Sequence, residues 1–243
     1  MKRTLVIGDI HGGFKALLQV FKRANVTTND TLIFLGDYVD GWSESAQLIE
    51  FLIDLDKKQK CIFIKGNHDV WCHEWLLNLY IGNYGIWYKN GGKETIASYN
   101  SQEFDTEKHL QFFDQLINYY VDKENRLFIH AGFSSMKGPE NEVYLTNYRW
   151  DRTLWEMAIV MDKRVKKDSA FYPNRLKLYN EIYIGHTPTL HYETIVPMQG
   201  INVWNIDTGA AFTGKLSVLD IDTKEFWQSD SLPSLYPNEK GRN

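Results

Sequence analysis

The first half of the chain repeats one pattern three times: a short apolar run, a Gly-Asp or Gly-Asn pair, and a stretch with apolar residues at helical spacing. The apolar runs cover 5–7, 31–35 and 61–64, and the helical stretches cover 14–24, 43–55 and 68–80. Strands that are apolar throughout indicate a sheet covered on both faces, with the helices as crossovers between parallel strands. Ligands of such sheets collect at the carboxyl ends of the strands, where all three Gly-Asp/Asn pairs lie.

The second half has a different pattern. It predicts helices over 103–120 and 147–162, and strands over 126–130, 181–184, 202–206, 215–220 and 225–228. The last two strands frame a hairpin turn at 221–224, and the basic segment 163–174 is predicted to be an exposed loop. Because no linker and no fixed repeat interrupts the chain, we predict a single domain over 1–243, with 230–243 as a tail.

Composition limits the class of protein. Hydrophobic residues make up 43% of the 243 residues, so the chain can bury a core without disulfides, and Cys61 and Cys72 are predicted to be free thiols in buried surroundings. A net charge of -4 argues against stable binding to nucleic acid. No stretch is apolar enough to span a bilayer, which predicts no membrane partner and a location in a reducing cytoplasm. The oligomeric state stays open.

Five short motifs each place a side chain that can bind a metal just after an apolar strand. One such motif alone would indicate a tight turn, whereas five at strand ends predict a shared site. Imidazole combined with carboxylate favours Mn, Fe or Zn, and the lack of cysteine argues against a thiolate zinc site. The neighbouring glycines are expected to turn the chain sharply through positive φ. The motifs are Gly8-Asp9-Ile10-His11-Gly12, Gly36-Asp37-Tyr38-Val39-Asp40, Gly66-Asn67-His68-Asp69, His130-Ala131-Gly132 and Gly185-His186-Thr187.

In this order the motifs resemble those of the calcineurin-like metallophosphoesterases. The sequence is most similar to the serine/threonine phosphoprotein phosphatases, especially their small bacterial and bacteriophage members. Those members also carry a Gly-His-Thr-Pro segment, which stands here at 185–188, and a late Ile-Asp-Thr-Gly-Ala run, which stands at 206–210. The resemblance spans residues 4 to 219 and implies an α/β fold, a four-layer αββα sandwich of two mixed sheets with metals at the strand ends.

The resemblance also implies roles for individual residues. A water or hydroxide shared by two divalent metals, Mn²⁺ first and Fe or Zn as alternatives, would attack phosphorus. His68 matches the family's general acid, worth about 10²–10⁴ in rate, and Asp40 matches its carboxylate partner. The alternatives for His68 are a seventh ligand or a hydrogen bond at a helix start. The implied ligands are Asp9 and His11 at the first metal, Asp37 bridging both, and Asn67, His130 and His186 at the second.

Arginine suits a phosphate clamp because its planar fork matches two phosphate oxygens. In the most similar members an arginine ends a Trp-x-Arg segment, and here that arginine is Arg152. Arg149 is the second candidate for this contact. Lys65, before Gly66, is a weaker third candidate that would equally suit a solvated strand end.

The chain departs from the family pattern in two places. Eukaryotic-type members carry a phosphate-contacting arginine after the second aspartate of Gly-Asp-x-Val-Asp, whereas Gly41 and Trp42 follow Asp40 here, and Trp42 is expected to pack against the next helix. The third motif ends in Asp69, a form also found in dinucleoside polyphosphate hydrolases. An aromatic stretch could stack a purine, although packing is the commoner role; its members are Trp71, Trp75, Tyr80, Tyr84, Trp87 and Tyr88.

Three hypotheses for function follow. The first is a metal-dependent phosphomonoesterase that acts, like a serine/threonine protein phosphatase, on a phosphorylated protein or a small phosphate ester. The second is a dinucleoside tetraphosphate hydrolase, motivated by Asp69, the missing arginine and the aromatic stretch. The third is an inactive phosphate-binding scaffold. Nothing in the sequence favours it, because every expected ligand position is retained.

Overall fold

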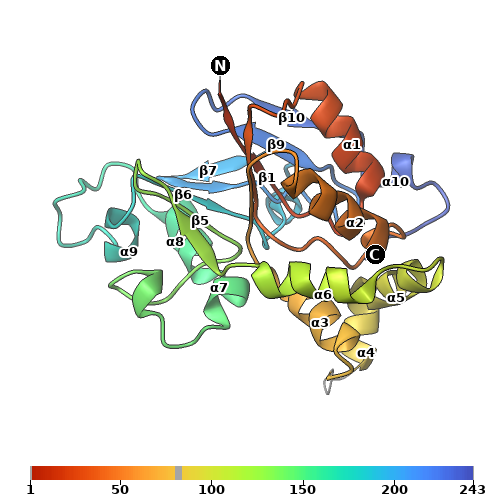
Figure 1. Ribbon diagram of the computed structural model, residues 1–243. Helices are drawn as coiled ribbons and strands as arrows, with labels where there is room; N and C mark the ends of the chain where they lie inside the picture. The colour runs from red at the N-terminus through yellow and green to blue at the C-terminus, as the bar shows by residue number, and fades with distance from the viewer. Residues whose placement is uncertain (1, 80–83, 243) are drawn as a thin grey trace.

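The strands form two five-stranded sheets in a computed structural model that describes residues 2–79 and 84–242 (Figure 1). The first sheet has the order β10-β9-β1-β2-β3. Its strands are β1 (Thr4–Ile7), β2 (Thr31–Phe34), β3 (Cys61–Phe63), β9 (Ser217–Asp220) and β10 (Phe226–Gln228). The second sheet has the order β4-β5-β6-β8-β7. Its strands are β4 (Tyr119–Val121), β5 (Arg126–Ile129), β6 (Glu181–Ile184), β7 (Met198–Gly200) and β8 (Val203–Asn205).

Both sheets are mixed. In the first, β1, β2 and β3 run parallel, while β9 is antiparallel to β1 and β10 to β9. In the second, β5, β6 and β8 run parallel, and the edge strands β4 and β7 are antiparallel to their neighbours. The parallel strands therefore end at a common edge of each sheet, and these edges hold the candidate site.

Helices cover the outer face of each sheet (Figure 1). The first sheet packs against α1 (Phe14–Arg23), α2 (Ser45–Asp56), α3 (Asn67–Leu76) and α6 (Thr106–Gln115). The second packs against α7 (Asn147–Trp150), α8 (Thr153–Val160) and α9 (Asn174–Lys177). The remaining elements are α4 (Tyr84–Trp87), η1 (Tyr88–Gly92), α5 (Lys93–Asn100), η2 (Pro139–Asn141), η3 (Thr189–Tyr192) and α10 (Leu232–Leu235).

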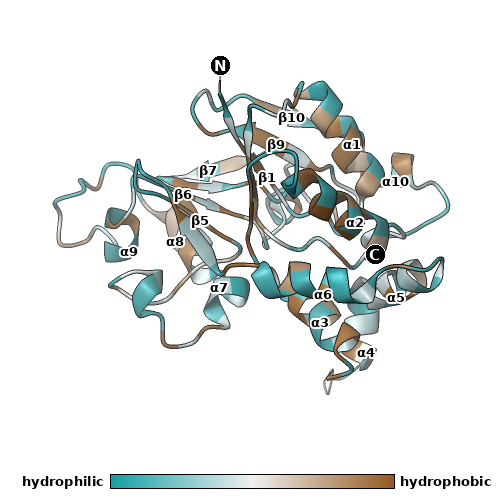
Figure 2. Ribbon diagram, in the orientation of Figure 1, coloured by the Kyte–Doolittle hydropathy of each residue, from teal (hydrophilic) through white to brown (hydrophobic). Residues whose placement is uncertain are grey.

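A central core between the two sheets explains why the strands are apolar on both faces. Val6 and Ile33 of the first sheet pack there with Phe128 and Tyr183 of the second, whose rings stack with centroids 5.0 Å apart. Figure 2 shows these inner strands as largely hydrophobic. The four layers, helix–sheet–sheet–helix, confirm the predicted αββα sandwich. Helices cover one face of each sheet, as predicted, whereas the other face meets the second sheet.

Several element boundaries differ from the sequence prediction. The helix expected over 103–120 is α6 alone, and residues 119–121 form β4 instead, because they pair with β5 at the edge of the second sheet. The helix expected over 147–162 breaks at Asp151, whose extended backbone (ψ 126°) and side chain cap the start of α8. The predicted helix over 68–80 ends at Leu76, and Tyr80 lies outside the described residues.

The segment 230–243 was expected to be a tail, and the structure corrects this. Leu232 and Tyr236 are at most 1% exposed and belong to the core beneath the first sheet. Tyr236 stacks on Trp42, with ring centroids 5.1 Å apart, so Trp42 packs against the end of the chain as well as the core. A single apolar turn, α10, carries too few residues to be recognised from periodicity.

Both thiols are free, as predicted. Cys72 is buried, as expected, whereas Cys61 is only half-buried. None of the described helices is long and apolar enough to cross a membrane.

Candidate metal centre

The six predicted ligands come together at the carboxyl ends of five parallel strands. Each follows its strand directly or by a few residues, and each is at most 8% exposed. The ligands on β1, β2 and β3 face those on β5 and β6 across the sandwich. The residues are Asp9, His11, Asp37, Asn67, His130 and His186.

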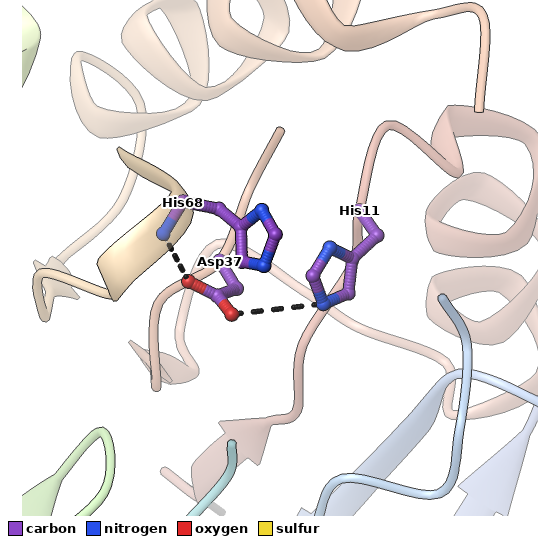
Figure 3. A group of neighbouring side chains, drawn as sticks. All are labelled: His11, Asp37 and His68. Atoms are coloured by element: carbon purple, nitrogen blue, oxygen red, sulfur yellow. Dashed lines mark hydrogen bonds and ion pairs between the residues drawn. The ribbon is translucent and has the colours of Figure 1, made fainter. Parts of the chain in front are cut away.

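Asp37 lies at the centre of this group. Its Oδ2 is 3.6 Å from Nε2 of His11 and 3.4 Å from Nε2 of His130. Its Oδ1 accepts a hydrogen bond from the backbone N–H of His68 at 3.0 Å (Figure 3). Potential ligand atoms of His11, Asp37 and His68 lie within 4.8 Å of one another, and so do those of Asp37, His130 and His186. Asp37 is therefore shared between two candidate sites, as a bridging carboxylate requires.

Hydrogen bonds to backbone carbonyls orient the two imidazoles that flank Asp37. Nδ1 of His11 lies 2.8 Å from the carbonyl oxygen of Asp40, and Nδ1 of His130 lies 2.8 Å from that of Leu35. A carbonyl only accepts, so each Nδ1 carries a proton, which leaves Nε2 as the ring nitrogen that would bind a cation beside Asp37. This is the usual arrangement of metal-binding histidines, whose second ring nitrogen is fixed by an outer partner.

Unpartnered buried atoms and crowded carboxylates indicate that the site lacks positive charge. Oδ1 of Asp9 and Nε2 of His186 are buried and have no hydrogen-bond partner among the residues that the structure describes. Burial and the nearby Asp207 carboxylate raise the pKa of Asp9 well above its usual value. Burial opposes a charge on His130, but Asp37 and Asp9 raise its pKa to about 10. Buried atoms with free lone pairs beside crowded carboxylates fit divalent cations.

Four site residues have a left-handed backbone, which is uncommon outside glycine. The φ angles are 53° at His11, 52° at Asp37, 70° at Asp40 and 65° at His186. Such conformations cost about 1–3 kcal/mol each and persist where the surrounding structure fixes them, often at functional sites. The prediction that the neighbouring glycines have positive φ is confirmed at Gly12 and Gly36. It is wrong at the other motif glycines, Gly8, Gly66, Gly132 and Gly185.

Gly185 serves the site through close approach. A Cβ atom at this position would lie 2.0 Å from Oδ1 of Asp9. No side chain fits there without moving the Asp9 carboxylate, whose Oδ2 accepts a hydrogen bond from the His186 N–H. The β6 turn is therefore packed directly onto the first ligand.

Gly185→Ala is expected to weaken binding of Mn²⁺ by about 10–100-fold, the usual effect of disturbing a group that positions a ligand. Calorimetric titration of the metal-free protein with Mn²⁺ measures this effect. The control is the same substitution in an Asp9→Ala background. If the alanine acts through Asp9 it causes no further loss there, whereas an additive loss would contradict this explanation.

His68 and Asp40 form a buried pair beside the candidate ligands. Nδ1 of His68 lies 2.7 Å from Oδ2 of Asp40, which also accepts a hydrogen bond from the Trp87 indole at 2.7 Å. The Thr95 hydroxyl donates to Oδ1 of Asp40 at 2.6 Å. Burial raises the pKa of Asp40 to about 8 and lowers the pKa of His68 to about 3. Near neutral pH the pair therefore shares one titratable proton.

Asp69 fixes the loop that carries Asp37, a role the sequence did not reveal. Its carboxylate accepts the backbone N–H groups of Gly66, Asp37 and Tyr38 at 2.7–2.9 Å. The carboxylate thus ties the loop after β2 to the start of α3. Both carboxylate oxygens of Asp69 accept these hydrogen bonds, and Asp69 does not line the cavity.

A cavity of about 250 Å³ opens above the candidate ligands. Arg152 lines it, as predicted for a phosphate contact, whereas the wall formed by the described residues includes neither Arg149 nor Lys65. Those two lie near each other on the side of Asp69. A larger cavity of about 630 Å³ beside α2, β3 and α6 contains none of the predicted site residues. The sequence analysis did not assign several residues of the smaller wall to the site, among them Trp150, His191, Asp207 and Arg242.

The aromatic stretch divides between packing and the cavity. Trp87 is buried and Trp75 packs against the core, as the packing interpretation predicts. Trp71 instead lines the cavity, where its ring lies 4.9 Å from that of His68 and 5.6 Å from that of Trp150. Trp150 in turn contacts His186 at 5.7 Å. The two indoles thus contact each other on the cavity wall.

Comparison with known proteins agrees with this geometry. Residues 2–208 match the model of the calcineurin-like phosphoesterases. The chain is 28% identical to bis(5'-nucleosyl)-tetraphosphatase PrpE [asymmetrical] of Bacillus cereus, with 96% of this chain and 94% of that protein covered. It is 26% identical to the protein of the same name from Anoxybacillus flavithermus, with the same coverage.

Solved structures with low sequence identity share the fold. A serine/threonine phosphatase from Saccharomyces cerevisiae, similar to human phosphatase PP5, superposes with a TM-score of 0.58 at 16% identity, over 95% of this chain and 80% of that one. A metallophosphoesterase from Sphaerobacter thermophilus superposes with a TM-score of 0.53 at 15% identity, over 94% and 87%.

Proposed function

Because this chain belongs to the calcineurin-like phosphoesterase family, we propose that it hydrolyses dinucleoside tetraphosphates. Water would add to one phosphorus of the polyphosphate bridge, and the P–O bond to the neighbouring phosphate would break. The products would be two mononucleotides. That the chain is a metallophosphoesterase follows from the family; the choice of substrate is our proposal.

We assign the metal site to the six converging ligands. Bound there, two divalent cations would neutralise phosphate oxygens and supply a water molecule of lowered pKa. Three imidazoles, two carboxylates and an amide suit Mn²⁺, with Fe or Zn as alternatives. His68 would hold the proton that the leaving oxygen takes, and Asp40 would orient its ring. Arg152, which makes no ion pair with the described residues, would contact a phosphate group.

The Trp71–Trp150 pair is the observation that carries the choice of substrate. Both indoles line the same cavity as the ligands, and Trp150 is 45% exposed. An indole ring on the wall of a phosphate site suits a molecule that carries a base near its phosphates, because stacking on an aromatic side chain is worth about 1–3 kcal/mol per base. The tetraphosphatase names of the curated relatives support the same choice.

Trp71→Leu is expected to raise the KM for diadenosine tetraphosphate by about 5–150-fold, the loss of one stacked base. The KM for tripolyphosphate, which has the same linkages but no base, should change little. Steady-state kinetics of the Mn²⁺-loaded enzyme with both substrates test this. Trp227→Leu, on β10 and outside the cavity wall, is the matched control.

Two results would count against the proposal. An equal loss on both substrates would show that Trp71 supports the site without binding a base. If the wild-type enzyme cleaves a phosphoserine peptide far faster than diadenosine tetraphosphate, the protein phosphatase predicted from the sequence is the better assignment. The scaffold hypothesis predicts no hydrolysis of any of these substrates, and the convergence of all six ligands speaks against it.

A further inference from the structure

The end of the chain places a cation in the candidate active site. Arg242 lines the cavity together with His11, Asp37 and His68. More than half of the sequence separates Arg242 from each of these three residues. Resting on the function proposed above, we infer that Arg242 is a phosphate-binding residue, which holds a phosphate group of the substrate beside the metal ligands.

The segment before Arg242 is anchored, so the arginine is held at the cavity. Tyr236 stacks on Trp42, and the carboxylate of Glu239 accepts hydrogen bonds from the N–H and hydroxyl of Ser43 at 3.0 and 2.7 Å. Gly241 then turns with φ 61°, close against the Trp42 ring. These contacts fix the chain on the loop that directly follows Asp40.

Backbone and stem contacts then fix Arg242 itself. Its N–H donates to the carbonyl of Ala211 at 2.9 Å, and its guanidinium lies 5.2 Å above the ring of Phe212. A Cβ atom at Gly41 would lie 3.4 Å from its Cγ, so the stem runs alongside a residue without a side chain. Gly41 therefore leaves the space that the arginine occupies.

The guanidinium keeps most of its donors for a ligand. Within residues 2–79 and 84–242, its one hydrogen-bond acceptor is Oδ1 of Asn90, at 2.8 Å, and it forms no ion pair with a carboxylate. Its Nε is buried without a partner. A guanidinium has five N–H donors in a fork that matches two phosphate oxygens. A charged group with a neutral partner, facing a cavity, is suited to an anionic ligand.

Arg242 and Arg152 line the same cavity from different segments of the chain. The stem of Arg242 runs beside Gly41, in the loop that follows Asp40. Arg152 stands at the start of α8, two residues after Trp150, whose ring lies 5.7 Å from that of His186. Two cations on one cavity wall suit a chain of phosphates better than a single one.

The test uses inorganic phosphate, titrated calorimetrically into the full-length, Mn²⁺-loaded protein. Arg242→Ala and Arg242→Gln should each raise the Kd for phosphate by about 10–150-fold, the value of a hydrogen bond to a charged group. Arg242→Lys, which keeps the charge but loses the fork, should fall in between. Metal content and melting temperature should stay unchanged. Arg164→Ala, an exposed arginine 91% accessible at its side chain, is the control.

A Kd within twofold of wild type in the glutamine variant overturns the inference. So does a loss of metal or of folding that the lysine and glutamine variants share, because it would show a structural role. Phosphate binding does not depend on the identity of the ester. An enzyme that fails to cleave dinucleotides but loses phosphate affinity on Arg242→Gln would thus refute the proposed substrate and uphold Arg242.

Discussion

Asp37→Asn is expected to remove both metal ions and to lower turnover on every phosphate ester by more than about 100-fold. Replacing a residue that only orients a ligand costs up to about 100-fold, and the loss of a ligand itself should cost more. The reason is geometric, because Oδ2 of Asp37 lies 3.6 Å from Nε2 of His11 and 3.4 Å from Nε2 of His130. Asparagine keeps the shape but lacks the negative charge and the second acceptor oxygen. Metal analysis after dialysis, together with an assay on p-nitrophenyl phosphate, measures both effects.

Thermal unfolding gives an independent reading of the same change. A ligand that binds only the folded state stabilises it by about 2.7 kcal/mol at one hundred times its Kd. Added Mn²⁺ should therefore raise the melting temperature of the wild type but not that of Asp37→Asn. Asp222→Asn, at an exposed carboxylate paired with Arg126, should behave like the wild type. Two equivalents of tightly bound metal in Asp37→Asn would refute the bridging role.

The positions of the metal ligands could be predicted because local sequence and topology coincide there. A parallel strand that ends in Gly-Asp or Gly-His delivers its side chain to a common edge, whatever the rest of the chain does. Asp9, Asp37 and His186 satisfy this rule, and the structure brings them together. The pairing of His68 with Asp40 followed instead from the resemblance to the metallophosphoesterases, and the two side chains do lie 2.7 Å apart.

Contacts between distant segments could not be predicted from the sequence. Arg242 reaches the cavity only because α10 and Tyr236 dock on Trp42, and no spacing rule relates residues two hundred positions apart. Asp69 belongs to the third motif, but its carboxylate accepts hydrogen bonds from three backbone N–H groups, which the motif alone did not indicate. The edge strand β4 lies within an apparently helical pattern, where pairing with β5 overrides local preference.

The absence of a cation after Asp40 takes on a different meaning in the structure. Gly41 has no side chain and Trp42 supplies a platform, and together they accommodate the end of the chain. From the sequence alone, this departure argues against a protein phosphatase more than against a phosphoesterase in general. In the structure a guanidinium nevertheless lies beside Gly41, brought by a segment that was expected to be a tail.

His68→Asn is expected to lower turnover by about 10²–10⁴-fold on an alkyl phosphate such as phosphoserine, the usual contribution of a general acid. The loss should be small on p-nitrophenyl phosphate, whose leaving oxygen is a weak base and needs little protonation. Metal content should stay at the wild-type level. Asp40→Asn should reproduce this dependence on leaving group in milder form, because Asp40 orients the ring through the 2.7 Å contact. His73→Asn, at a histidine outside the cavity wall, is the control.

The same variant separates the two interpretations of His68 and bears on the substrate. A ligand atom of His68 lies within 4.8 Å of those of His11 and Asp37, so a seventh ligand would lose metal on substitution and slow all substrates alike. A general acid would leave the metals in place. A nucleotide departs from a polyphosphate as a weakly basic phosphate oxygen, so hydrolysis of diadenosine tetraphosphate should survive His68→Asn far better than that of phosphoserine. Hydrolysis of such a substrate would depend on the bound cations and on the Trp71–Trp150 pair more than on His68.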